Sequence, residues 1–135
     1  MKATLLLIAI VILTVEPTRA LAMEFTSLSP GRNEVELRHE GQPRRLIITA
    51  PKDYGRKNPY PVLFCFHGAG GKAEGQSQRW SAHADKRGLI VISVEAVQPL
   101  AKWNFKDGFH AEEHDDVGLV AKVVAVLITK KIGDP

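Results

Sequence analysis

The 135-residue sequence is poor in cysteine, in aromatic residues and in net charge. Its single cysteine, Cys65, excludes an intrachain disulfide, and its place within an apolar run predicts a buried, unreactive thiol. Aromatic residues make up 7% of the chain, too few to predict an exposed aromatic binding platform. A net charge of +3 is too small to indicate a nucleic-acid partner. The hydrophobic content of 44% and the length together predict one globular domain.

A catalytic serine in the pattern G-x-S-x-G is also lacking. Ser77 comes nearest, in the segment GQSQR, but Arg79 occupies the position of the second glycine and no predicted strand precedes it. The glycines that follow His67 match neither G-x-x-x-x-G-K-[ST] nor G-x-G-x-x-G, the spacings of loops that bind phosphate groups. These 135 residues therefore show neither such a nucleophile nor a nucleotide-binding loop.

The first 22 residues are organised like a secretory signal peptide. Lys2 precedes an uncharged, largely apolar run over residues 3–15, and Ala20 and Ala22 form an A-x-A cleavage pattern. The run is shorter than the roughly 20 apolar residues of a membrane span, which makes an uncleaved anchor helix the weaker alternative. Cleavage would remove two basic residues and one acidic residue and leave residues 23–135 with a charge of +2. We therefore expect a secreted or periplasmic protein without stable membrane association.

The rest of the chain alternates between strand and helix patterns, which predicts an α/β fold. In order, the pattern predicts an antiparallel hairpin of strands 34–39 and 44–51 with a turn at 40–43, strand 62–66, helix 77–88, strand 89–94, and a helix from Asp115 and Asp116 to Lys130 and Lys131. Strand 62–66 is apolar on both faces, which favours helices above and below it rather than an edge position. The last helix carries one broad apolar face, made of Val117, Val120, Val124 and Leu127 and widened by Leu119, Val123 and Val126. Together these elements predict a three-layer sheet with crossover helices.

The segment HGAGG, residues 67–71, begins where strand 62–66 ends. In an α/β sheet, ligands bind beyond the carboxyl ends of the strands. Glycines there let backbone N–H groups approach a bound atom closely, and amides aimed at one point stabilise a developing oxyanion. An oxyanion loop of the HGGG type therefore fits the position and composition of this segment, and a plain glycine turn is the alternative.

Residues 44–135 resemble the amino-terminal half of the secreted esterases grouped with polyhydroxybutyrate depolymerases and feruloyl or acetylxylan esterases. The matching segments, in order, are RRLIITAP, PYPVLFCFHGAGG, ADKRGLIVISVEA, KWNF, DDVGLVAKVV and KKIGDP. The resemblance implies an incomplete α/β-hydrolase sheet, in which the nucleophile strand and the carboxyl-terminal half are absent. It also implies a small-molecule or polymer ester as substrate and no cofactor.

The same resemblance implies roles for several residues at the end of strand 62–66. The main-chain amide of Ala69 or of Gly70 would be an oxyanion donor, and Gly68 belongs to the same substrate-binding loop. Trp103 would line or support the substrate cleft, with simple packing as the alternative. His67 would anchor the loop rather than act as the catalytic base, since the base of this fold comes last in the chain.

Asp116 would cap and position the last helix by the same resemblance. No catalytic residue is expected in this chain, because the family's serine, acid and histidine would follow Pro135. Losing the nucleophile costs about 10⁶ in rate, whereas one oxyanion donor contributes about 10²–10³. We therefore expect the isolated chain to be inactive. The edge of strand 62–66 that faces the missing strand would be bare and prone to aggregation.

Two alternatives come from other classes of function. His110, Glu113 and His114 match the zinc motif H-x-x-E-H, in which two histidines bind the metal and the glutamate activates water. Gly108 and the acidic helix start place His110 in a loop before the helix, however, and no third ligand is evident. A non-catalytic secreted binding module is the other alternative, and no sequence feature favours it.

Overall fold

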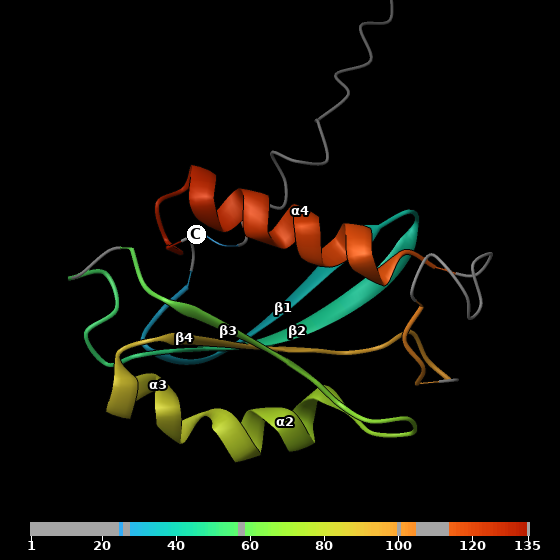
Figure 1. Ribbon diagram of the computed structural model, residues 1–135, viewed down its shortest axis with the longest axis horizontal. Coiled ribbons are helices and arrows are strands. Elements are labelled where there is room, and N and C mark those ends of the chain that lie inside the picture. Colours follow the sequence, from blue (N-terminus) through green and yellow to red (C-terminus); the bar gives the residue numbers. More distant parts are fainter. Residues whose placement is uncertain (1–24, 26–27, 57–58, 100, 105–113, 135) are drawn as a thin grey trace, which may run out of the picture.

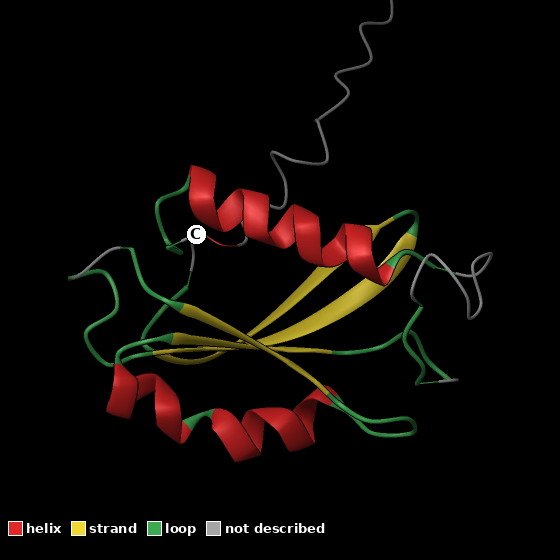
Figure 2. Ribbon diagram, viewed as in Figure 1, coloured by secondary structure: helices red, strands yellow, loops and turns green. Residues whose placement is uncertain are grey.

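The computed structural model describes residue 25 and residues 28–56, 59–99, 101–104 and 114–134. In this part of the chain four strands form one mixed sheet, with α4 on one face and α2 and α3 on the other (Figure 1, Figure 2). The elements are β1 (Gly31–His39), β2 (Gln42–Ala50), β3 (Val62–Phe66), α2 (Ala73–Trp80), α3 (Ala82–Arg87), β4 (Ile90–Val94) and α4 (Asp116–Thr129). The predicted three-layer α/β architecture is thus confirmed.

The predicted signal peptide, residues 1–22, lies outside the described residues. In the described part of the chain, no helix has both the length and the apolar character needed to cross a membrane.

β1 and β2 form the predicted antiparallel hairpin. Along β1, Val35 and Leu37 are buried while Glu36 and Arg38 are exposed, so one face of the strand contacts solvent. Glu40 and Gly41 connect the strands with φ values of 49° and 77°, the signature of a two-residue type I′ turn. This turn is shorter than the predicted one over 40–43, because strand pairing already includes Gln42.

The strand order is β1-β2-β4-β3, with β4 antiparallel to β2 and parallel to β3. Every residue of β4 is buried, since helices cover both of its faces and strands lie on both sides. On the α4 side the core includes Leu46, Ile48 and Ile92 against Leu119 and Val123. A smaller cluster on the α2 and α3 side joins the residues Cys65, Ala84, Val91, Leu63, Trp80 and Leu89.

β3 differs from the prediction of a strand buried on both faces. Only Cys65 is buried, and Phe66 is 45% exposed. The outer edge of β3 has no strand beside it among the described residues, as the family resemblance implied. Its apolar composition therefore exceeds what the observed neighbours cover, which fits a strand that needs a partner on its outer side.

The segment after α4 begins to supply such a partner. The Tyr60 N–H donates to the Ile132 carbonyl at 2.8 Å, and the Asp134 N–H donates to the Tyr60 carbonyl at 2.9 Å, so the two segments run parallel. The next carbonyl, that of Pro61, instead accepts from Ile90 at the start of β4. Because successive backbone groups point to opposite sides of a strand, the segment after α4 enters the sheet on the side of β3 away from β4.

The predicted helix over 77–88 is two consecutive helices, α2 and α3. Ser81 separates them but keeps right-handed helical angles, φ −54° and ψ −37°, so the break is small. α2 begins at Ala73, before the predicted start, because the carboxylate of Glu95 accepts the Ala73 N–H at 2.8 Å. Gly88 ends α3 in the left-handed conformation with φ 61°, which confirms it as the C-terminal stop.

The buried face of α4 is rotated relative to the predicted one. Leu119, Val123, Val126 and Leu127 are buried, whereas Val117 is 49% exposed. Asp116 is also buried, and it lies one helical turn before Leu119 on the same face. The buried carboxylate therefore sets the rotation of the helix, a constraint that apolar periodicity alone does not reveal.

We predict that the purified chain self-associates through β3 and the exposed Phe66. The substitution Phe66→Lys should lower concentration-dependent association, because it puts a charge on the edge strand. Ile128→Lys is the matched control, since Ile128 is similarly exposed, at 43%, but lies on α4. Sedimentation velocity over a concentration series measures the effect. Equal suppression by both variants would mean that the edge is not the contact.

Candidate active site

The loop from His67 to Lys72 joins the carboxyl end of β3 to α2. The Gly71 N–H donates to the Gly68 carbonyl at 2.9 Å and closes a four-residue turn. Gly70, the third residue of this turn, has a φ of 72°, which a type II turn requires and which glycine adopts readily. A Cβ at Gly71 would lie 3.0 Å from both the Gly68 oxygen and the Cβ of His67. Gly70 is therefore needed for its backbone conformation, and Gly71 is needed because a larger residue would clash.

The two amides predicted as oxyanion donors differ in their partners. The Gly70 N–H donates to the Ala101 carbonyl at 3.3 Å. Ala69 is exposed, and its N–H has no hydrogen-bond acceptor among the described residues. Of the two, the Ala69 amide is the one available to a developing oxyanion, although that role stays a prediction.

His67 is 4% exposed, and both of its ring nitrogens have partners. Its Nε2 accepts the Ala96 N–H at 3.2 Å, and its Nδ1 lies 2.8 Å from the Gly68 carbonyl oxygen. A nitrogen that accepts an amide N–H carries no proton, so Nδ1 is the donor to Gly68 in a neutral ring. The ring thus ties the loop to the end of β4, and these contacts support the predicted anchoring role.

Trp103 holds the same loop from the other side. Its indole N–H donates to the His67 carbonyl at 2.7 Å. Its ring packs edge-on against that of Phe66, with 5.1 Å between the ring centroids. Beside it lies an apolar hollow of about 480 Å³, lined by Phe66, Trp103, Asp116, Val117, Val120 and Ala121. The structure therefore brings Trp103 into contact with the predicted oxyanion loop, and the same residue lines this hollow.

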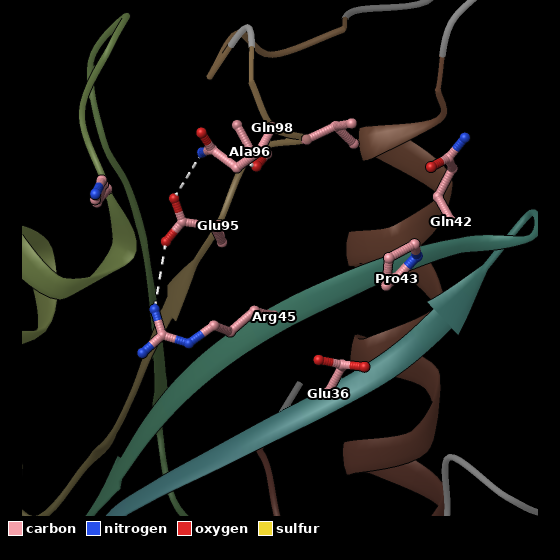
Figure 3. Close-up of a pocket in the computed structure, with 9 residues that line it drawn as sticks. Glu36, Gln42, Pro43, Arg45, Glu95, Ala96 and Gln98 are labelled. Atoms are coloured by element: carbon pink, nitrogen blue, oxygen red, sulfur yellow. Dashed lines mark hydrogen bonds and ion pairs between the residues drawn. The ribbon is translucent and has the colours of Figure 1, made fainter.

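A second hollow, of about 420 Å³, lies near the other end of the loop and is lined mostly by polar side chains (Figure 3). Figure 3 shows Glu95 between Arg45 and Gln98, and the Gln98 amide donates to the Glu95 carboxylate at 3.0 Å. The other carboxylate oxygen accepts the first N–H of α2, that of Ala73. Glu95 therefore satisfies a helix start whose own N-cap, Lys72, provides no side-chain bond. The sequence analysis missed this role, and its only signal is an acidic residue directly after a strand that is apolar except for Ser93.

Asp116 does not cap α4, which corrects the prediction. The N-cap is Asp115, whose Oδ1 accepts the Gly118 N–H at 2.8 Å. Asp116 instead forms a buried ion pair with Arg44 at 2.5 Å and accepts the Asn104 N–H at 2.6 Å. The sequence reading also missed Arg44, although strand alternation places it on the same face of β2 as the buried Leu46.

Only part of the alternative zinc motif can be described. His110 and Glu113 lie outside the described residues. The His114 Nε2 lies 3.1 Å from a carboxylate oxygen of Asp116, and the His114 side chain is 5% exposed. This ring therefore faces the Arg44–Asp116 pair.

Three side chains with nucleophilic atoms, Ser77, Ser93 and Cys65, are buried. Ser77 accepts a hydrogen bond from Arg32 at 3.3 Å within α2, and Ser93 is fully buried in β4. Burial raises the pKa of the Cys65 thiol, which disfavours the reactive thiolate. These three side chains lie inside the fold, where the carbonyl carbon of an ester substrate cannot reach them.

We predict that Gly71→Ala shifts the loop, because the new Cβ meets a backbone oxygen. The free energy of unfolding should fall by about 1–3 kcal/mol. In a Trp80→Phe background, the fluorescence of Trp103 should shift to longer wavelength as its bond to His67 loosens. Gly75→Ala is the control, since nothing lies near a Cβ there. Unchanged emission in Gly71→Ala would show that the loop tolerates the methyl group.

We predict that Asp116→Asn lowers the free energy of unfolding by about 3–5 kcal/mol, because it leaves the Arg44 guanidinium buried without its counter-charge. The double variant Arg44→Met, Asp116→Leu should recover part of this loss. Lys52→Met, which breaks an exposed ion pair with Asp85, should cost less than about 1 kcal/mol. Urea unfolding measures all three. A loss in Asp116→Asn no larger than in Lys52→Met would contradict the importance of the buried pair.

No protein-family model matches the chain, and no curated protein matches it either. One similar solved structure is LpqC, a poly(3-hydroxybutyrate) depolymerase from Bordetella parapertussis, with a TM-score of 0.62 and 20% sequence identity. The match covers 89% of this chain and 44% of that protein, so this chain spans less than half of its length. At this identity the likeness concerns the fold. The chain therefore has a small α/β fold that resembles part of an α/β-hydrolase.

Proposed function

We propose that residues 23–135 are the amino-terminal part of the catalytic domain of an exported carboxylic-ester hydrolase with a serine nucleophile. The amide of Ala69, which follows β3 and donates to no described residue, is the observation that carries the proposal. In the reaction, a serine hydroxyl attacks the ester carbonyl and negative charge builds on its oxygen. The Ala69 N–H donates to that oxygen, while His67 and Trp103 hold the loop in place.

The serine itself is proposed to follow the segment Ile132–Asp134. This segment already runs parallel to the residues before β3, on the outer side of that strand. A strand continuing in the same direction would end beside the loop His67–Gly71, because the carboxyl ends of parallel strands share one edge of the sheet. A turn there would carry the nucleophile in the pattern G-x-S-x-G.

Polyesters such as poly(3-hydroxybutyrate), feruloyl esters and acetyl esters are the proposed substrates. The depolymerase LpqC supports the first by its fold likeness. The predicted signal peptide supports export, which places the enzyme where an extracellular polymer is accessible. The apolar hollow beside Phe66 and Trp103 suits the acyl part of such an ester.

The proposal is tested on the gene product read past codon 135, which should encode G-x-S-x-G soon after Pro135. That longer protein should hydrolyse p-nitrophenyl butyrate and react with a fluorophosphonate probe. The chain ending at Pro135 should do neither. A reading frame without G-x-S-x-G would contradict the proposal and favour the non-catalytic binding module.

In the longer protein, Ala69→Pro should lower kcat about 10²–10³-fold, because proline has no N–H to donate. Proline is also favoured at the second position of a type II turn, so the loop should keep its shape. Ala69→Ser is the matched control, since it keeps the amide, and its kcat should be nearly unchanged. Steady-state kinetics with p-nitrophenyl butyrate measures both. An equal kcat in both variants would show that another donor binds the oxyanion.

A further inference from the structure

Three side chains with metal-binding atoms meet where the β1–β2 hairpin turn approaches the start of α4. They are His39 at the end of β1, Glu40 in the turn and Asp115, the N-cap of α4, and their ligand atoms lie within 4.8 Å of one another. Figure 1 shows the hairpin turn beside the amino-terminal end of α4. We propose that these three residues bind one divalent transition-metal cation, for which Zn²⁺ is the probe. This site is separate from the esterase proposal and does not depend on it.

The buried imidazole of His39 is the first observation that points to a ligand. Its side chain is only 10% exposed, and its Nε2 is buried with no hydrogen-bond partner among the described residues. A buried polar atom without a partner is costly, so most such atoms in folded proteins are satisfied. A metal ion would use the lone pair of this nitrogen.

The spacing of the ligand atoms is the second observation. The Nε2 of His39 lies 3.6 Å from the Oδ2 of Asp115, which is longer than an ordinary hydrogen bond. Zinc binds nitrogen and oxygen ligands at about 2.0–2.2 Å, so two ligands on one tetrahedral ion lie about 3.3–3.6 Å apart. The observed separation fits two atoms that share an ion rather than a proton.

The charges of the site also suit a divalent cation. Glu40 and Asp115 supply two carboxylates beside the imidazole of His39. A mixed set of one imidazole and two carboxylates favours Zn²⁺ and related ions over Mg²⁺ and Ca²⁺, which prefer oxygen ligands alone. Glu40 is exposed, so solvent can complete the coordination.

Neighbouring residues hold the Asp115 carboxylate in place. Its Oδ1 accepts the Gly118 N–H at 2.8 Å, and this bond orients Oδ2 toward His39. A Cβ at Gly118 would lie 1.8 Å from Oδ2, so only glycine there permits this position. The backbone of Glu40 has a φ of 49° in a type I′ turn, which suits asparagine or glycine better than glutamate. A glutamate at this position is therefore consistent with a role for its carboxylate as a ligand.

The test is zinc binding by the untagged, chelator-treated chain at pH 7.5. Competition with a chromophoric zinc indicator should give one site per chain, and zinc should raise the Tm. His39→Gln should weaken zinc binding at least about ten-fold. Glu40→Asn is the sharper variant, because asparagine fits the turn. Its Tm without zinc should equal or exceed that of the unchanged chain, while its zinc affinity and its zinc-induced rise in Tm should be lower.

Two controls separate this site from other histidines. His83→Gln, on α3, should bind zinc like the unchanged chain. His110→Gln should also leave zinc binding unchanged. If His110→Gln abolished zinc binding while His39→Gln retained it, the ion would lie in the H-x-x-E-H motif and the proposal would be overturned. Absence of zinc binding by the unchanged chain would overturn it as well, and would leave a His39–Asp115 ion pair as the explanation of the geometry.

Discussion

The buried ion pair between Arg44 and Asp116 connects most of the parts on which the candidate site depends. Arg44 comes from β2 and also donates to the main-chain carbonyl of Glu95, which follows β4. Asp116 begins α4 and accepts the main-chain N–H of Asn104. Asn104 directly follows Trp103, whose indole N–H holds the carbonyl of His67. A charge pair in the core is therefore linked to the loop from His67 to Lys72 through two further hydrogen bonds, so loss of the pair should displace the loop.

Two adjacent carboxylates at the start of α4 have different electrostatic roles. Asp115 satisfies a free N–H of the first turn, whereas Asp116 neutralises a buried guanidinium. Because neighbouring residues on a helix point about 100° apart, the two carboxylates face different surroundings. One is directed to the hairpin turn and the other to the core. This division also explains why the apolar face of α4 is rotated away from Val117, which lies exposed at the apolar hollow.

Much of the fold follows from local patterns that the sequence displays openly. The hairpin, the buried strand β4, the stop at Gly88 and the three-layer architecture were all predicted, because alternation, β-branched runs and glycine stops are short-range signals. The errors have a common origin in long-range contacts. The early start of α2 depends on Glu95, and the orientation of α4 depends on Arg44, and in each case the partner is distant in the chain. The bare outer edge of β3 was expected from the family resemblance, whereas the partial exposure of its side chains depends on which elements lie beside it, and its composition cannot report that.

The amino-acid sequence was enough to predict the class of fold, the position of the glycine loop at the end of a strand and the candidate residues in that loop. The three-dimensional contacts were needed to distinguish the amides of the loop, since the Gly70 N–H donates to Ala101 and the Ala69 N–H donates to no described residue. They also decided that Asp115 rather than Asp116 caps α4, and that His39, Glu40 and Asp115 meet. The physical reason is the range of the forces involved. Backbone propensities and hydrophobic periodicity act over a few residues, whereas hydrogen bonds and ion pairs join atoms whose separation along the chain is arbitrary.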